Sequence, residues 1–252
     1  GTYLLECFFV GSYFQIDSYT GNGANRTLSF DSTLDTAPGF MVFHDRVDNG
    51  MEKLAYHESL GNGKFLQCEA ASAAGTSATF LNSTSPTTTT FRLGTMDNVN
   101  KNTSTYIMYA WANSAVYSFG DYTGNSNADG SFINVGGRPQ VFCGKPTTSA
   151  DSWLVKYDAL LEYNVNGKRL YWEATNAVST STSDGLVDFV STGVKNRISS
   201  TGLNSSTYGN YVYMAYGIQP LTDGAINQGR ADGTSGAPLA IATGGTITLD
   251  GD

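Results

Sequence analysis

Residues 106–112 read YIMYAWA, and the same kind of run returns as YVYMAYG at residues 211–217 and as YLLECFF at residues 3–9. Each run is rich in aromatic and aliphatic side chains and is bounded by polar residues. Short continuous apolar runs between turn residues are typical of β-strands that are buried on both faces or nearly so. We therefore expect three copies of one strand, offset by 103 and 105 residues.

The segments between these runs also repeat, and they do so in the same order. YTGN at residues 19–22 returns at residues 122–125, and NGK at residues 62–64 returns at residues 166–168. An apolar strand that follows Pro38 has a counterpart that follows Pro139. Small changes of offset between fixed blocks are what loop insertions between strands produce. The chain therefore contains an internal duplication, which indicates two modules of about 100 residues each.

Composition agrees with β-structure. Charged residues make up only 14% of the chain, and Gly, Ser, Thr and Asn fill the space between the apolar runs. Long helices need Ala, Leu, Glu and Lys instead. We predict an all-β fold of two tandem antiparallel β-sandwich modules, jelly-roll-like, over residues 1–112 and 113–221. Residues 222–252 are expected to form a Gly/Thr-rich linker and the start of a further strand or module.

The first copy of the strand, residues 2–10, has no module body before it, so the chain looks cut from a longer array. An exposed strand carrying Tyr3, Leu5, Phe8 and Phe9 would leave several large apolar side chains in water. We favour pairing within the first module. Completion of an upstream module, and addition to a neighbouring subunit, are the alternatives.

The charge balance and the hydropathy exclude some partners. The net charge is −8 and the isoelectric point about 4.6, so nothing in the chain favours binding to nucleic acid. No run of 18 apolar residues exists, and therefore we expect no membrane span. The chain has neither an initiator Met nor a signal peptide, which indicates a mature product or a segment of a longer protein.

The three cysteines, Cys7, Cys68 and Cys143, are odd in number and widely spaced. A disulfide framework needs an even number at short spacing. Each cysteine lies in an apolar, strand-like run, so we predict three buried free thiols. Reduced thiols fit assembly in a cytoplasm.

No catalytic constellation is predicted. Residues 233–238 (GTSGAP) are similar to the serine-nucleophile loop of chymotrypsin-like proteases. That chemistry needs a His base and an orienting Asp. The chain has only His44 and His57, and neither has the apolar, small-residue surroundings expected of such a base, so we interpret both as surface residues. We expect a linker at residues 233–238, and neither an enzyme nor a bound cofactor.

Asp121, Asn125, Asn127 and Asp129 have the oxygen-rich spacing of a calcium loop. A calcium loop usually ends on a bidentate Glu, and the corresponding position holds Gly136. The same residue types build tight turns through hydrogen bonds from side chain to backbone. We therefore predict a turn and no metal, with these four residues as the alternative metal ligands.

The tryptophans are the candidates for stacking on a sugar ring. Trp111 aligns with Tyr216 in the repeated strand, and Trp172 aligns with Cys68, so both are expected in the core or half-buried. Trp153 has no such constraint. It is therefore the residue that we single out for glycan stacking.

Several blocks of the second module carry a resemblance to a known family. They are FGDYTGN (119–125), NADG (127–130), WLVKYD (153–158), VDFVSTG (187–193), TGLN (201–204) and the closing strand at 211–217. In this order the blocks resemble a β-sandwich module of tail-fibre and other virion-surface proteins of tailed phages, notably marine ones. The first module joins this resemblance mainly through the internal repeat.

The resemblance implies a non-enzymatic structural protein on a virion surface, assembled in the host cytoplasm as a homo-oligomer. Its partners would be copies of itself and other virion proteins, in a tail fibre, a head fibre or a capsid-decoration assembly. A lectin-like module that recognises host surface glycans is the main alternative. A glycan-degrading enzyme is a third possibility, and it would need two carboxylates about 5–10 Å apart.

Overall fold

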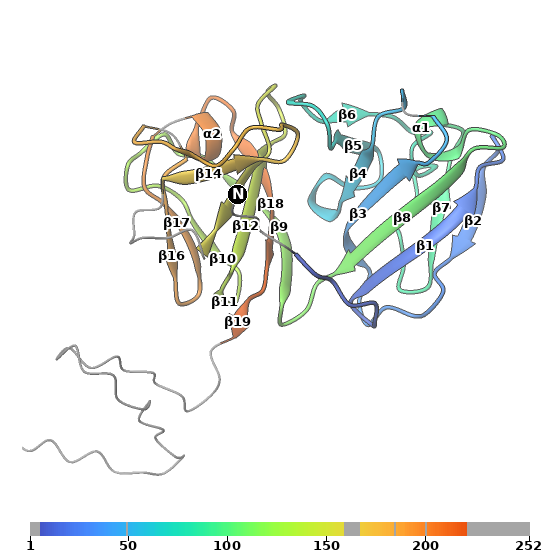
Figure 1. The fold of residues 1–252 in the computed structure, drawn as a ribbon, viewed down its shortest axis with the longest axis horizontal. Coiled ribbons are helices and arrows are strands. Elements are labelled where there is room, and N and C mark those ends of the chain that lie inside the picture. Colours follow the sequence, from blue (N-terminus) through green and yellow to red (C-terminus); the bar gives the residue numbers. More distant parts are fainter. Residues whose placement is uncertain (1–5, 49, 159–166, 184, 200, 221–252) are drawn as a thin grey trace, which may run out of the picture.

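The computed structural model describes residues 6–48, 50–158, 167–183, 185–199 and 201–220. Within these ranges the chain is nearly all β-structure, in two modules that lie side by side, the first on the right and the second on the left of Figure 1. The strands pair antiparallel throughout the described ladders. The prediction of an all-β fold of two antiparallel sandwich modules is confirmed. No helix in the described ranges is long and apolar enough to cross a membrane.

The first module places a large six-stranded sheet against a small two-stranded sheet. The large sheet has, in spatial order, β1 (Phe14–Thr20), β8 (Thr105–Ala112), β3 (Pro38–Asp45), β4 (Leu54–His57), β5 (Lys64–Gln67) and β6 (Gly75–Thr76). The small sheet has β2 (Arg26–Ser29) and β7 (Thr90–Leu93). A 3-10 turn, η1 (Glu58–Leu60), follows β4, and a short helix, α1 (Asp97–Asn100), precedes β8.

The second module repeats the strand order of the large sheet, and its small sheet has a third strand. Its large sheet has, in spatial order, β9 (Tyr117–Thr123), β18 (Asn210–Tyr216), β12 (Val141–Pro146), β13 (Leu154–Tyr157), β14 (Lys168–Tyr171) and β15 (Ser179–Thr180). The small sheet has β10 (Phe132–Asn134), β17 (Gly193–Asn196) and β16 (Val187–Val190). The remaining elements are the pair β11 (Gly137–Arg138) and β19 (Gln219–Pro220), and the helix α2 (Thr201–Asn204). The duplication inferred from the sequence is therefore a duplication of the fold.

The YTGN block fastens the first strand of each module to the closing strand. Tyr19 stacks on Tyr106 with ring centroids 5.0 Å apart, and Tyr122 stacks on Tyr211 at 5.1 Å. The hydroxyls of Tyr19 and Tyr122 each donate to a carbonyl in the short helix of their module, at 2.7 and 2.8 Å. The repeated tyrosine is therefore a structural residue.

The glycine and the asparagine of the same block complete this joint. A Cβ at Gly21 or Gly124 would lie 2.1 or 2.5 Å from a backbone oxygen, so only glycine fits this approach. The following backbone N–H donates to the side chain of Asn100 or Asn204, each fully buried. Each of these asparagines also donates to backbone carbonyls of its own module, which satisfies its buried amide.

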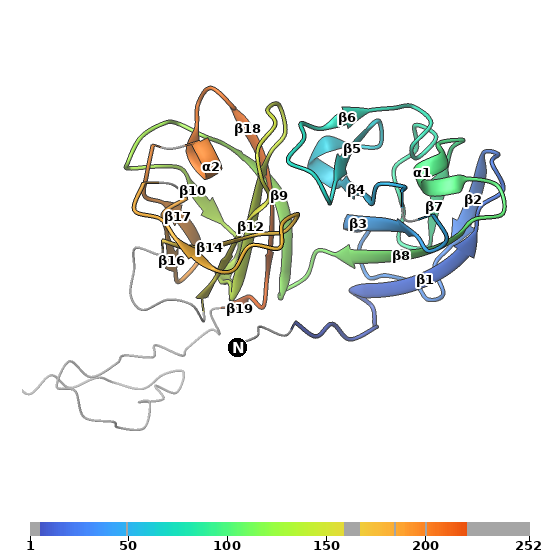
Figure 2. The same ribbon diagram turned by 45° about the horizontal axis from the view of Figure 1, so that its top comes forward.

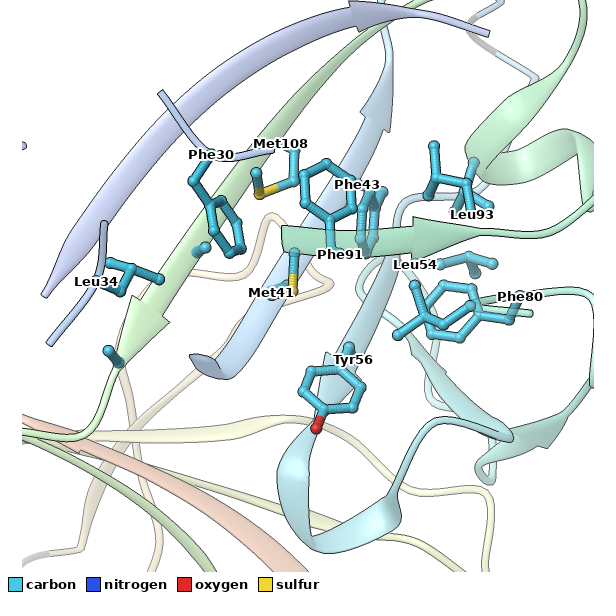
Figure 3. Close-up of a cluster of buried hydrophobic side chains, with 14 residues drawn as sticks. Phe30, Leu34, Met41, Phe43, Leu54, Tyr56, Phe80, Phe91, Leu93 and Met108 are labelled. Atoms are coloured by element: carbon cyan, nitrogen blue, oxygen red, sulfur yellow. The ribbon is translucent and has the colours of Figure 1, made fainter. Parts of the chain in front are cut away.

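Each module has its own core between its two sheets. Figure 3 shows the core of the first module, where side chains of β3, β4 and β8 meet those of β7 and the loops beside it. A matching cluster fills the second module, with Phe142, Leu154, Phe189 and Tyr211 among its members. Each core joins strands that are distant in the sequence, and burial of its apolar side chains stabilises the packing of the two sheets.

The prediction that residues 2–10 form a first copy of the closing strand is wrong for the part that the structure describes. Residues 6–10 form no strand, Phe9 is 85% exposed, and residues 2–5 lie outside the described ranges. In each large sheet the closing strand lies between the first and third strands, and in the first module β8 already fills that position. A second copy therefore cannot occupy the position between β1 and β3. The last strand of the first module, β8, ends at Ala112, and the first strand of the second, β9, begins at Tyr117. Residues 222–252, the predicted linker, lie outside the described ranges.

Candidate functional site

The two modules are joined through the outer faces of their large sheets. Along β3 the side chains alternate, so that Met41 and Phe43 enter the first core while Phe40 and Val42 point toward the second module. The same outer face of the second large sheet meets them. The shared cluster contains Phe40, Val42, Ala55, Leu66, Cys68, Phe119, Val141, Cys143, Trp153, Val155, Val212 and Met214. Both large sheets are therefore buried on two faces, as their apolar runs indicate.

His57 belongs to this interface, and our interpretation of it as a surface residue is wrong. Its side chain is fully buried, and Nε2 lies 3.0 Å from the carbonyl oxygen of Tyr213 in the other module. The backbone N–H of Ser59 donates to Nδ1 at 3.2 Å, so the proton is on Nε2, which donates to Tyr213. Burial lowers the pKa of His57 to about 4. The imidazole is therefore neutral and serves as a hydrogen-bond bridge.

Trp153 is a second bridge between the modules. Its side chain is 2% exposed, and its indole Nε1 donates to the carbonyl of Gln67 at 2.8 Å. A buried ring has no free face for a sugar, so the structure corrects our choice of Trp153 as the stacking residue. Nearby, Nζ of the buried Lys145 donates to the carbonyls of Ser72 and Asp151, at 2.6 and 2.5 Å. Burial lowers the pKa of Lys145 to about 8.

The cysteines divide between the interface and the surface. Cys68 and Cys143 are buried in the shared cluster, where burial raises the pKa of the Cys68 thiol to about 12. Cys7 is exposed, so its predicted burial is wrong. All three are free thiols, as predicted.

The oxygen-rich segment of the second module is held as a series of turns. Asn125 Oδ1 accepts from the backbone N–H of Asn127, and Asn127 Oδ1 accepts from that of Asp129, at 3.0 and 2.9 Å. The carboxylate of Asp129 pairs with Lys195 at 2.8 Å. Asp121 lies before the loop, within β9. These contacts fit the turn interpretation. In the ranges that the structure describes, no three His, Cys, Asp or Glu side chains gather as a metal centre would require.

On one side of the interface the two large sheets separate and leave a cleft of about 500 Å³. We call it the aromatic cleft. Its walls come from both modules, and apolar rings dominate them. The lining residues are Glu6, Phe8, Phe14, Ile16, Phe40, Val42, His44, Lys53, Cys68, Tyr109, Trp111, Tyr117, Phe119, Trp172, Met214 and Tyr216. A concave, mostly apolar cavity of this volume with a few polar groups is typical of a small-molecule site.

Three rings form a continuous row in this cleft. Phe40 lies between Trp111 of the first module and Trp172 of the second, with centroid distances of 5.8 and 6.4 Å. Trp172 is 42% exposed, although it also contacts the buried Trp153 at 5.6 Å. Trp172 follows directly after β14, at the margin of the sheet. It is therefore the tryptophan that offers a ring face to a ligand.

The segment before β1 forms another wall of the aromatic cleft. It runs from the first module toward the second, as Figure 2 shows. The ring of Phe8 contacts those of Phe14, Trp111, Tyr117 and Tyr216 at 5.4 to 6.4 Å. One carboxylate oxygen of Glu6, in this segment, accepts hydrogen bonds from the hydroxyls of Tyr157 and Tyr216, at 2.6 and 2.8 Å. Burial and the Glu6 charge raise the pKa of Tyr216.

The polar groups of the cleft carry both signs of charge. Glu6 supplies a carboxylate on the segment before β1, and His44 and Lys53 supply nitrogen groups from the first module. Lys53 also pairs with Glu69. Burial lowers the pKa of His44, so this imidazole is neutral at pH 7. The cleft can therefore both donate and accept hydrogen bonds around an apolar floor.

One family matches the chain, over residues 10–220, and it is described as a domain of unknown function. The chain belongs to the DUF7483 family. Because a single match runs across both modules, the unit that defines DUF7483 includes the interface and most of the aromatic cleft. No curated protein and no solved structure matches the chain.

The residues that line the aromatic cleft of this DUF7483 protein could be predicted from the sequence only in part. The tryptophans were the right residue type to consider. However, Trp153, predicted to stack on a glycan, is buried, and Trp172, expected in the core or half-buried, is exposed in the cleft. Nothing in the sequence indicated that Glu6 and Phe8 would leave the sheet and line a cleft. The alignment of Trp172 with Cys68 was the one available signal, since it placed both on the same face of equivalent sheets. The loop at residues 233–238 lies outside the described ranges.

Proposed function

We propose that the chain is a structural protein of a phage virion surface, in a tail fibre, a head fibre or a capsid-decoration assembly. The observation that carries the proposal is the way the modules are fused. Apolar side chains fill the interface, and hydrogen bonds from His57, Trp153 and Lys145 cross it. Buried polar groups that take a hydrogen-bond partner across an interface favour one relative orientation of the two modules. A stiff double module is suited to a protein that is repeated many times in a particle.

The sequence blocks of the second module support the same proposal, because they resemble virion-surface sandwich modules. The net charge of −8 favours solubility in a highly repeated assembly. The described surface also offers apolar side chains for contacts with other copies, among them Phe9, Val10 and Phe132. Among the residues described around the aromatic cleft, Glu6 is the single carboxylate, so the cleft does not supply the pair that glycosidic cleavage uses.

Gold-labelled antibodies against the purified chain test this proposal on intact particles. We expect labels at regular positions on a fibre or on the capsid surface, viewed by negative-stain electron microscopy. A matched antibody against an unrelated host protein should leave the particles bare. Labels absent from particles, together with the chain in the soluble fraction of the lysate, would contradict the proposal.

A further inference from the structure

The aromatic cleft leaves apolar side chains exposed that the internal packing of the described structure does not cover. Trp172 keeps 42% of its surface exposed beside Phe40, and Ile16 on the opposite module is 38% exposed. Exposed apolar side chains gathered in a concavity with a polar rim mark an interaction site. Residues of both modules and of the segment before β1 line it, so its shape depends on the intact double module.

The chemistry of the cleft restricts its occupant. The exposed ring of Trp172 and the half-buried ring of Trp111 favour a ligand with a flat apolar face, and the buried Phe40 packs between them. Glu6 already accepts from Tyr157 and Tyr216, and Lys53 pairs with Glu69. Both charged groups also line the cleft, so a ligand with hydroxyl groups at its edge can add hydrogen bonds where a wholly apolar ligand would only displace water. The net charge of −8 and the carboxylate of Glu6 disfavour an anion. Sugar rings combine apolar C–H faces with hydroxyl edges and can be uncharged.

We propose that the aromatic cleft binds a neutral saccharide, with a sugar ring stacked on Trp172 beside Phe40 and its hydroxyls bonded to Glu6. Trp172 comes from the second module, and Phe40 and Trp111 come from the first, so the site exists only when the two are joined. This inference goes beyond the structural role. It concerns the purified chain alone, so a failure of the virion proposal and a failure of this one are separate results.

An array of immobilised neutral oligosaccharides tests the proposal with the full chain. We expect binding to a subset of the array, followed by a shift of tryptophan fluorescence when the same free oligosaccharide is titrated. Trp172→Ala should weaken the binding by at least about tenfold, equivalent to ~1.4 kcal/mol. Trp172→Phe keeps a stacking face and should restore most of the affinity.

Phe132→Ala is the matched control, since Phe132 is an aromatic residue of the same module, is 49% exposed and lies outside the cleft. It should bind as the unaltered chain does, and thermal melting should show that all variants are folded. Absence of binding anywhere on the array would overturn the proposal, as would equal binding by Trp172→Ala. A dimer in light scattering that Trp172→Ala dissolves would overturn it too, by showing that a second copy fills the cleft.

Discussion

Ile16 in β1 and Phe119 in β9 occupy the same position in the two modules, 103 residues apart, and both point to the outer face of the large sheet. Phe119 is 7% exposed and stacks on Phe40 of the other module, with ring centroids 6.1 Å apart. A Cβ at Gly39 would lie 2.5 Å from the Phe119 ring, so glycine makes this contact possible. Ile16 remains 38% exposed in the aromatic cleft.

This difference shows how two copies of one fold produce a site that neither has alone. Both side chains line the aromatic cleft, but Phe119 of β9 is covered by Phe40 of the other module, whereas Ile16 of β1 stays partly exposed. The cleft is therefore a consequence of broken symmetry between equivalent strands. Substitutions on the closed side should weaken the double module, while those on the open side should leave its stability nearly unchanged.

Trp153→Ala should have the largest effect on the closed side. Removing a fully buried tryptophan costs about 3–5 kcal/mol, and the carbonyl of Gln67 would also lose its donor. We expect the free energy of unfolding to fall by that amount in urea, monitored by circular dichroism, with one transition for both modules. Trp172→Ala is the control on the open side and should cost less. Two separate transitions in the unaltered chain would show that the modules unfold independently.

The His57 bridge should make the closed side sensitive to acid. The folded-state pKa is about 4, below the ordinary value of 6.5, so this contribution to stability is complete above pH 6.5 and is lost as the pH falls toward 4. The shift corresponds to roughly 3 kcal/mol. His57→Gln, which keeps a donor for the Tyr213 carbonyl without titrating, should flatten the stability profile over this range.

The measurement is the free energy of unfolding in urea between pH 7.5 and pH 4, compared between the unaltered chain and His57→Gln. Burial and the neighbouring Asp31 raise the pKa of Asp17 to about 6. Its contribution has the opposite sign, since it is complete below pH 3.8 and is lost as the pH rises through 6. Asp17 is present in both proteins, so the comparison cancels it. Parallel profiles would exclude His57 as the acid-sensitive group.

Alanine substitutions at the two equivalent positions should give the smallest, and most direct, contrast. Phe119→Ala should cost about 3 kcal/mol, because it leaves a void against Phe40 and His57. Ile16→Ala should cost less than about 1 kcal/mol, because its side chain is already partly in water. The two free energies of unfolding can be measured side by side in urea. Equal losses would mean that the interface closes on both sides in solution.

Much of the fold could be predicted from the sequence, because local patterns encode it. The repeated blocks and the apolar runs at 106–112 and 211–217 indicate the duplicated all-β modules, and their strands lie where expected. The interface could not be predicted in the same way. A sequence shows that an outer face is apolar, but not which distant face covers it. Hence Trp153 was predicted to be free for a ligand, and Trp172 was expected in the core or half-buried.

The predictions for His57 and for residues 6–10 were wrong for related reasons. A polar residue such as histidine normally indicates the surface, and its partner Tyr213 is 156 residues away in the other module. The segment YLLECFF matches a strand in composition, yet β8 already occupies the only equivalent place in the sheet. Similarity between short segments cannot show that another strand already occupies the corresponding position in the sheet.

The face-to-face packing of the two large sheets also sets how the protein responds to dilution. Separate modules carrying Phe40 and Val42, or Val141 and Cys143, on an outer face would have to find each other in solution, and the fraction paired would fall with concentration. On one chain, each module meets its partner at an effective concentration in the millimolar range. A cleft formed in this way stays assembled on a single molecule, however few copies the surroundings contain.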